Sequence, residues 1–206
     1  MKPMFYLLIS IVAFSTIINF LGGCQRIDTV LAPPIPIPPP QTLLSNGNPG
    51  SWFGNAVTLS TFGGCATSSS VTALSDALSG NPNTLLLNTP AVCGVFEFDS
   101  PVTVDPTPYY SKGHLQFDIL LGSAPSNYSS INVQFFYSNG ADASYNLPAN
   151  LINSLSSTVF TRVSIPLTAF PGYNLITNVD TPFYMLWQTS TSSSTIVLDN
   201  VQWTAN

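Results

Sequence analysis

Apolar and polar side chains alternate along several short stretches beyond residue 110 of this 206-residue chain. A two-residue period of this kind is typical of β-strands that bury one face and expose the other to water. The alternating stretches are residues 115–119, 131–135, 163–167, 183–187 and 196–201. Turn-forming residues separate them, and among these an Asn139-Gly140 pair favours a tight hairpin. We therefore expect antiparallel strands throughout this part of the chain.

Helical periodicity is weak by comparison, and only residues 147–155 are expected to form a short helical turn between strands. Many short strands without long helices predict an all-β domain built as a β-sandwich, and a jelly roll is its expected form. Pro166 lies inside one of the alternating stretches. Because proline has no N–H to donate to a neighbouring strand, its strand should lie at a sheet edge or contain a bulge there.

The N-terminal residues 1–23 are mostly apolar after Lys2 and end in Leu21-Gly22-Gly23, directly before Cys24. An apolar leader that ends in small residues before a cysteine resembles the signal peptide of bacterial lipoproteins. The resemblance implies cleavage before Cys24, lipidation of that cysteine and attachment to the cell envelope. Because Gln25 and not aspartate follows, it further implies the outer membrane if the organism has one. An uncleaved membrane helix is the alternative, although the apolar run is shorter than the roughly 20 residues that a span needs.

Residues 24–44 contain a proline-rich run from Pro33 to Pro40, which can form neither a helix nor an inner strand. Such a run favours the extended polyproline II conformation, at about 3.1 Å per residue. We expect a stiff spacer between the lipid anchor and the sandwich, and a docking site for a proline-binding module is the alternative. The expected organisation is a signal peptide at 1–23, a lipidated cysteine with its linker at 24–44 and the sandwich domain at 45–206.

Charged residues make up only 6% of the chain, and its formal net charge is −5. An average soluble protein has roughly 25% charged residues, so serine, threonine and asparagine must cover much of the surface here. The sequence contains no basic patch, which disfavours binding to nucleic acid and attachment to a membrane through a polybasic segment. The composition is typical of a secreted β-protein.

The chain contains three cysteines. If Cys24 carries lipid, Cys65 and Cys93 remain as a pair, and disulfides persist in exported proteins. We therefore predict a Cys65–Cys93 bridge, with two separate buried thiols as the alternative. The spacing matches no zinc pattern, because the sequence has no CxxC motif and a single histidine.

The segment from Phe160 to Phe170 reads Phe-Thr-Arg-Val-Ser-Ile-Pro-Leu-Thr-Ala-Phe. It resembles a recurring segment of galactose-binding-like jelly rolls, which occur among carbohydrate-binding modules and as domains appended to bacterial glucanases. That segment usually opens with tryptophan, whose position Phe160 takes here. Residues 113–119 and 198–203 also fit the pattern, and residues 79–87 do so loosely. The resemblance covers residues 52–203 and implies this fold together with a role in glycan binding.

The same resemblance implies a structural calcium ion. In similar jelly rolls an acidic residue near the C-terminus helps to hold the ion, and Asp199 in the Leu-Asp-Asn-Val motif takes that position. Because calcium prefers about six to eight oxygen ligands, further ones such as Asp76 would be needed. The alternative is that Asp199 caps a loop through hydrogen bonds.

Two groups of side chains are candidates for binding a glycan. In the first group Gln116 and Asp118 share one face of their strand, as Gln134 and Phe136 do on theirs. If these strands pair, they form a strip of amides, a carboxylate and an aromatic ring, which suits the hydroxyl groups and apolar faces of sugars. The alternative is the ordinary solvated face of a sandwich.

The aromatic pair Tyr109 and Tyr110 is the second candidate. It follows Pro108 and precedes Lys112, so we expect it in an exposed loop where its rings could stack on a sugar. The alternative is that each ring plugs the edge of the core.

Catalysis is not expected. Glu97 and Asp99 lie on one face of a single stretch, so they point the same way and do not flank a glycosidic bond as a glycosidase pair does. His114 is the only histidine, and no Gly-x-Ser-x-Gly motif is present. We therefore expect a surface-tethered lipoprotein whose non-catalytic domain captures or attaches to a glycan. The alternative is a structural or adhesive envelope protein that binds a protein partner.

Overall fold

The computed structural model describes residues 36–62, 72–75, 84–89, 92–138, 140–190 and 193–205. The predicted leader, Cys24, most of the linker, Cys65 and Asp76 lie outside these residues. Within the described part, no helix is both long and apolar enough to cross a membrane.

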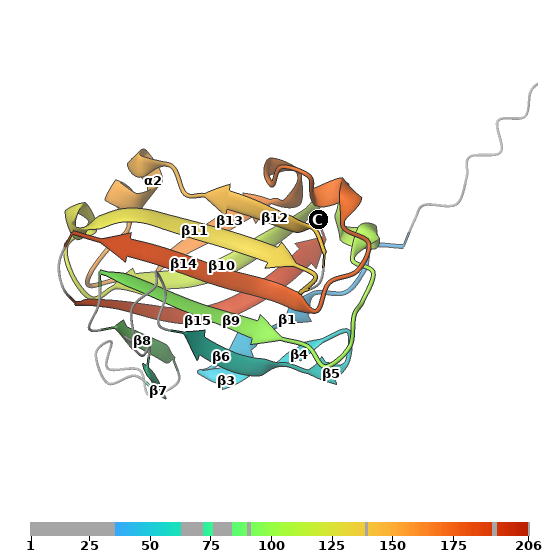
Figure 1. Ribbon diagram of the computed structural model, residues 1–206, viewed down its shortest axis with the longest axis horizontal. Helices are drawn as coiled ribbons and strands as arrows, with labels where there is room; N and C mark the ends of the chain where they lie inside the picture. Colours follow the sequence, from blue (N-terminus) through green and yellow to red (C-terminus); the bar gives the residue numbers. More distant parts are fainter. Residues whose placement is uncertain are drawn as a thin grey trace, which may run out of the picture. The chain divides into compact units, whose positions relative to one another are not determined.

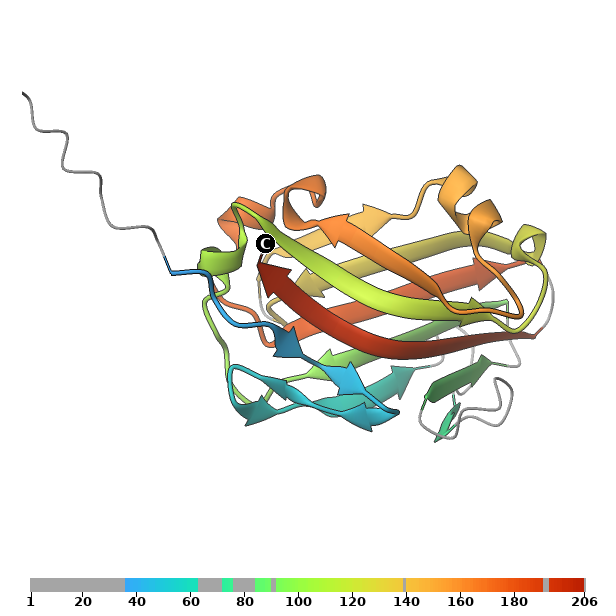
Figure 2. The ribbon, with the colours of Figure 1, turned by 180° about the vertical axis from the view of Figure 1, so that it is seen from behind.

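Two antiparallel sheets dominate the described residues (Figure 1). Sheet I runs in the order β13 (Thr161–Pro166), β10 (Gly113–Leu121), β15 (Ser194–Ala205), β8 (Leu85–Thr89) and β7 (Thr72–Ser75), and β1 (Gln41–Thr42) also pairs with β15. Sheet II runs in the order β12 (Asp142–Asn146), β11 (Tyr128–Phe136), β14 (Thr181–Thr189), β9 (Cys93–Asp99) and β6 (Thr58–Phe62). Sheet II faces the viewer in Figure 1 and sheet I does so in Figure 2, so the two sheets are the layers of a sandwich.

Short elements connect and flank the sheets. Two small hairpins pair β2 (Leu44–Ser45) with β3 (Asn48–Pro49) and β4 (Ser51–Trp52) with β5 (Asn55–Ala56). The helical elements are η1 (Thr107–Tyr109), η2 (Pro125–Asn127), η3 (Leu167–Ala169), η4 (Tyr173–Leu175) and the α-helix α2 (Ala149–Ser154). Helix α2 falls within residues 147–155, where the sequence predicts a helical turn, and this prediction is confirmed.

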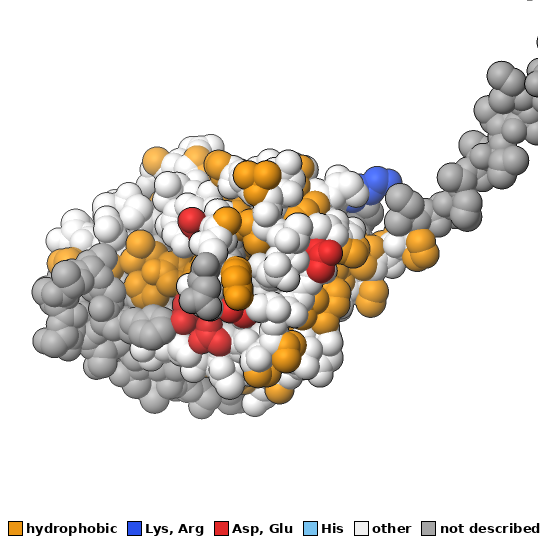
Figure 3. All heavy atoms as spheres, turned by 45° about the vertical axis from the view of Figure 1, so that its right-hand side comes forward, with side chains coloured by type: hydrophobic (Ala, Val, Ile, Leu, Met, Phe, Trp, Pro, Cys, Tyr) orange, Lys and Arg blue, Asp and Glu red, His pale blue; other side chains and the backbone are white. Residues whose placement is uncertain are grey.

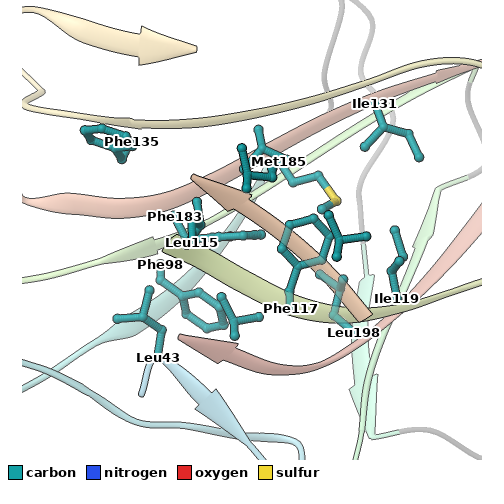
Figure 4. Close-up of a cluster of buried hydrophobic side chains, with 14 of the residues drawn as sticks. Leu43, Phe98, Leu115, Phe117, Ile119, Ile131, Phe135, Phe183, Met185 and Leu198 are labelled. Carbon is teal, nitrogen blue, oxygen red and sulfur yellow. The ribbon is translucent and has the colours of Figure 1, made fainter. Parts of the chain in front are cut away.

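The core lies between the sheets and is built by the alternation seen in the sequence. Leu115 and Phe117 of β10 and Phe183 and Met185 of β14 are fully buried in the space between the layers (Figure 4). The rings of Phe117 and Phe183, from opposite sheets, lie 5.5 Å apart in an edge-to-face arrangement. The prediction of an all-β sandwich is therefore confirmed.

The prediction for Pro166 is confirmed, and that of a hairpin around Asn139-Gly140 is confirmed for the pairing of its strands. β13 is the end strand of sheet I, and Pro166 is its last residue. The missing N–H of Pro166 therefore does not remove a hydrogen bond between two inner strands. β11 and β12 form an antiparallel pair, and the Gly140 N–H donates to the Tyr137 carbonyl in the turn between them at 2.9 Å. Asn139, the other half of the predicted turn pair, lies outside the described residues.

The sandwich begins earlier than the expected boundary at residue 45. β1 pairs with β15, with Gln41 opposite Trp203. The Leu43 N–H donates to the Val201 carbonyl at 2.8 Å, and the Leu43 and Leu44 side chains are fully buried. These two leucines are apolar enough to join the core directly after the linker.

β15 contains a β-bulge between its pairings with Gln116 and Asp118 of β10. Asn200 lies there with φ 50°, in the left-handed region that asparagine tolerates better than most residues. The extra residue changes which side chains point inward, so both Leu198 and Trp203 are fully buried. The strict alternation predicted over residues 196–201 therefore continues only as far as the bulge.

Candidate functional site

The strands that carry the predicted glycan strip lie in different sheets. β10, with Gln116 and Asp118, pairs with β13 and β15, whereas β11, with Gln134 and Phe136, pairs with β12 and β14. β10 and β11 therefore do not pair, and the condition on which the combined strip depended is not met. Each pair of side chains points away from the core, as the alternation predicts, but the two pairs lie on opposite outer faces of the sandwich.

Polar side chains on the outer face of sheet I bind one another. Gln202 Nε2 donates to Gln116 Oε1 at 3.2 Å, and Gln116 Nε2 donates to Ser164 Oγ at 3.1 Å. Asp118 accepts two hydrogen bonds from the Arg162 guanidinium, of which that from Nη2 to Oδ2 measures 2.8 Å. The predicted ligand residues of β10 therefore belong to a network that the protein satisfies internally.

Tyr109 and Tyr110 do not form an exposed pair. Both are buried, and their hydroxyl groups donate to the backbone carbonyls of Pro39 and Ile176, respectively. Burial raises the pKa of both phenols, so they stay protonated donors. Because they tie the N-terminal segment and the residue after η4 to the core, they offer no platform on which a sugar could stack.

The outer face of sheet II combines amide, aromatic and acidic side chains. Gln134 of β11 lies opposite Tyr184 of β14, which in turn lies opposite Glu97 of β9. At the two ends of this row, Ser144 of β12 is opposite Gln134 and Ser60 of β6 is opposite Glu97. Opposed residues of antiparallel strands point to the same side of a sheet. We use "sheet II face" for this row and its neighbours: Ser60, Glu97, Asp99, Asn132, Gln134, Phe136, Ser144, Asn146 and Tyr184.

Hydrogen bonds fix the amide groups of this face. Gln134 Nε2 donates to Asn132 Oδ1 at 2.6 Å. Asn132 Nδ2 donates in turn to Asn146 Oδ1 at 2.8 Å and to Ser144 Oγ at 3.2 Å. These hydrogen bonds hold the side chains of β11 and β12 in fixed positions.

The aromatic component comes from two neighbouring strands. The rings of Phe136 and Tyr184 lie 5.6 Å apart at 65°, and both are partly exposed. Burial and the nearby Glu97 carboxyl raise the pKa of Tyr184, so its phenol keeps its proton. The two rings provide an apolar surface beside the amides.

The acidic component lies on β9. Asp99 accepts a hydrogen bond from Ser60 Oγ at 2.7 Å on Oδ2 and one from Thr181 Oγ1 at 3.2 Å on Oδ1. Asp180, just before β14, accepts two hydrogen bonds from Ser138, at 3.0 Å from its N–H and 2.7 Å from its Oγ. In Figure 3 acidic side chains gather in the middle of the visible surface, with hydrophobic side chains beside them.

Glu97 is the acidic group whose protonation is most altered. Burial raises its pKa from 4.5 to about 7, and the Asp99 charge, a hydrogen bond with Asp99 and the Asp180 charge act in the same direction. A carboxyl group in this position exists in both protonation states near neutral pH. It can therefore accept or donate a hydrogen bond there.

A pocket of about 200 Å³ adjoins the sheet II face next to α2. Ser130 and Asn146 line it from the strands, and Ala149, Ile152 and Asn153 line it from α2. Asn146 belongs both to this pocket and to the amide network, so the polar surface continues toward the helix.

The sequence predicts Gln134 and Phe136 as members of such a face, but it does not show that Glu97 and Tyr184 belong to the same one. Glu97 and Tyr184 both lie in alternating stretches, and their outward phase can be read from the sequence. The order of the strands in the sheet cannot be read from the sequence. Only that order brings β14, and then β9, to the side of β11.

Comparisons with known proteins give matches among solved structures. No protein-family model and no curated protein matches the sequence. A family 30 carbohydrate-binding module is similar, with a TM-score of 0.55 and 18% identity over 82% of this chain and 88% of that module. The family 30 module of a cellulosomal cellulase from Clostridium thermocellum has a TM-score of 0.54 and 15% identity, over 82% of this chain and 99% of the module. The resemblance to jelly rolls of carbohydrate-binding modules is confirmed for the fold.

An exo-β-agarase shows a similar domain within a longer chain. Its TM-score is 0.50 at 10% identity, and the match covers 81% of this chain but 25% of the agarase. At such identities the likeness concerns the fold, because one fold can serve many functions.

Asp199 acts as a cap in this structure. Its Oδ1 accepts hydrogen bonds from the Asn46 N–H at 3.0 Å and the Asn200 N–H at 2.8 Å. Among the described residues no group of three or more His, Cys, Asp or Glu side chains could hold a metal ion. Asp76 lies outside those residues, so calcium binding by Asp199 and Asp76 stays a prediction. The same holds for the Cys65–Cys93 bridge, of which only Cys93, buried at the start of β9, is described.

Proposed function

We propose that this protein is a surface-tethered lipoprotein whose sandwich captures a glycan on the sheet II face without cleaving it. The observation that carries the proposal is the row in which Tyr184 lies between Gln134 and Glu97, with the Phe136 ring 5.6 Å from that of Tyr184. This row brings together the groups that sugar recognition requires.

The chemistry of a sugar matches these groups. Each pyranose ring offers hydroxyl groups at its rim, which pair with amides and carboxylates, and apolar C–H surfaces, which pack on aromatic rings. The hydrogen-bonded amides of Gln134 and Asn132 are fixed in advance, so binding loses little side-chain entropy there. Preorganisation of this kind favours capture of a ligand on an open sheet surface.

Similarity to family 30 carbohydrate-binding modules supports the proposal at the level of the fold. The arrangement of the acids supports a non-catalytic role. Glu97 and Asp99 are two residues apart on β9, so both extend from the same side of one strand. A glycosidase needs two carboxyl groups that flank the scissile bond.

The tether is the second part of the proposal. We infer that Cys24 carries lipid after cleavage of residues 1–23, and that the proline-rich run lifts the sandwich from the cell envelope, which is the outer membrane if the organism has one. More than one acyl chain would make the anchorage stable. Mass spectrometry of the protein from its native envelope should find an N-terminal lipidated Cys24, and an unmodified leader would contradict the tether.

Affinity electrophoresis over a broad panel of glycans tests the capture. We expect at least one glycan to retard the wild-type protein, and Tyr184→Ala and Gln134→Ala to lower the affinity deduced from the retardation about tenfold. Gln116→Ala is the matched control, because Gln116 lies on the outer face of sheet I, and it should keep the wild-type retardation. Circular dichroism confirms that each variant is folded.

The outcomes separate the alternatives. Loss of retardation in Gln116→Ala but not in Gln134→Ala would move the site to sheet I. A folded wild-type protein that no glycan retards would contradict glycan capture and favour the alternative of an adhesive envelope protein with a protein partner.

A further inference from the structure

Glu97 is the only glutamate of the chain, and it lies on the sheet II face between Tyr184 of β14 and Ser60 of the edge strand β6. The charged and titratable groups around it come from the strands on its own sheet. They are Asp99 on β9, Tyr184 on β14 and Asp180 immediately before β14. β6 contributes Ser60, which has no charge.

No cation offsets this negative charge within the described residues. Arg162 lies on β13 and binds Asp118 on the outer face of sheet I, and Lys112 lies in the turn before β10 of the same sheet. Each influence on the Glu97 carboxyl therefore favours its neutral form. Asp99, by contrast, already accepts a hydroxyl hydrogen bond on each of its oxygens.

We propose that Glu97 is protonated in the glycan complex and donates its proton to a sugar oxygen, so that capture takes up a proton and selects uncharged over polyanionic glycans. This inference rests on the proposed function of the sheet II face. The proton adds no covalent step: it comes from solvent and stays on the carboxyl group.

The physical reason is desolvation. Glu97 is partly exposed in the free protein, and a glycan on the face removes the water that still solvates its charge. The O–H of the neutral carboxyl, which bonds to Asp99 in the free protein, then turns to a sugar oxygen, and Asp99 keeps its hydrogen bonds from Ser60 and Thr181. A polyanionic glycan would bring further negative charge next to Asp99 and Asp180 with no cation in contact, which disfavours it.

The size of the effect follows from the pKa of Glu97 of about 7. If the glycan binds only the protonated form, the apparent dissociation constant rises as that form becomes rare. Between pH 6 and pH 8 the affinity should fall about tenfold, and at pH 7 capture should take up about half a proton per glycan bound.

Isothermal titration calorimetry of the full lipidated chain in neutral detergent tests this. The probes are uncharged hydroxyethyl cellulose, galactomannan and agarose, with anionic carboxymethyl cellulose as the charged counterpart. Titrations at pH 6, 7 and 8, in two buffers of different ionisation enthalpy, give the affinity and the number of protons taken up. The variant Glu97→Gln should bind with an affinity that no longer falls between pH 6 and pH 8. Asp142→Asn, which removes an exposed carboxyl from the edge strand β12, should keep the wild-type pH dependence.

The results distinguish the inference from the function beneath it. Binding of an uncharged probe without proton uptake, or an unchanged pH dependence in Glu97→Gln, would overturn the inference and leave glycan capture standing. Equal affinity for carboxymethyl cellulose and hydroxyethyl cellulose would overturn the selection for uncharged glycans. If no probe binds and the glycan panel also gives no retardation, the proposed function fails and the inference falls with it.

Discussion

Replacing Glu97 by glutamine removes the carboxyl whose charge the fold disfavours and keeps nearly the same shape. In the free protein burial, and then Asp99, raise the pKa of Glu97 from 4.5 to about 7. A carboxyl group with a raised pKa stabilises the folded state in its protonated form. This stability is fully present below about pH 4.5 and is lost as the pH rises through about 7. The wild-type protein should therefore lose stability relative to Glu97→Gln over this range.

The magnitude can be bounded from the structure. A rise in pKa from 4.5 to about 7 corresponds to at most about 3 kcal/mol of unfolding free energy. Because Glu97 is partly exposed, screening by water reduces this to about 1 kcal/mol. For a domain of this size, 1 kcal/mol lowers the melting temperature by about 2–4 °C.

Denaturant unfolding followed by tryptophan fluorescence measures the effect. Trp52, Trp187 and Trp203 are fully buried, so unfolding changes the surroundings of every tryptophan in the chain. The difference in unfolding free energy between wild type and Glu97→Gln is determined at pH 5, 6, 7 and 8. It should shift by about 1 kcal/mol in favour of the variant between pH 5 and pH 8.

Asp142→Asn serves as the control, because it removes one negative charge from an exposed position of the same sheet. Its difference from wild type should stay nearly constant over the same pH range. Parallel curves for wild type and Glu97→Gln would refute the reasoning, and so would a relative gain in wild-type stability at pH 8.

Three further predictions concern the fold. A Cβ on Gly94 would lie 2.1 Å from an indole carbon of the buried Trp187. Gly94→Ala should therefore lower the unfolding free energy by about 2–3 kcal/mol, and a loss below about 0.5 kcal/mol would contradict this close contact between Gly94 and Trp187. The predicted Cys65–Cys93 bridge should appear as one linked peptide pair in mass spectrometry of the native protein, whereas two free thiols would refute it. If Asp199 helps to bind calcium, a chelator should lower the melting temperature. An identical melting temperature with chelator and with added calcium would refute calcium binding.

The strands were predictable because the alternation that forms them is local. A residue pair such as Leu115 and Phe117 reveals its inward phase through its immediate neighbours alone. The assignment of strands to layers depends on long-range pairing. β10 and β11 follow one another in the chain, yet β10 pairs with β13 and β15, and β11 pairs with β12 and β14 in the other sheet. This explains why Gln116 and Gln134 have the predicted orientation and still do not meet.

Tyr109 and Tyr110 show a second limit of the sequence. Their setting between prolines and a lysine favours an exposed loop, but their burial depends on acceptors remote in the chain. The carbonyls of Pro39 and Ile176 lie 70 and 66 residues away from the tyrosines that donate to them. Local sequence carries no signal for such partners, so it cannot tell an aromatic platform from an aromatic plug.

The two outer faces of the sandwich differ in which polar groups they leave without a hydrogen bond, and this difference supports the proposed site on sheet II. On sheet I, Gln116 is bonded on both of its amide atoms and Asp118 is paired with Arg162, so a sugar would have to displace contacts already made. On sheet II, the Tyr184 hydroxyl has no hydrogen bond to another described residue, and it stands next to a carboxyl whose charge is poorly solvated. A sugar hydroxyl would gain a contact with the Tyr184 hydroxyl without breaking one, because an unpaired polar group favours a new partner more than a paired one does. Glycan capture should therefore depend on Tyr184 and Glu97 far more than on Gln116 and the other hydrogen-bonded side chains on the outer face of sheet I.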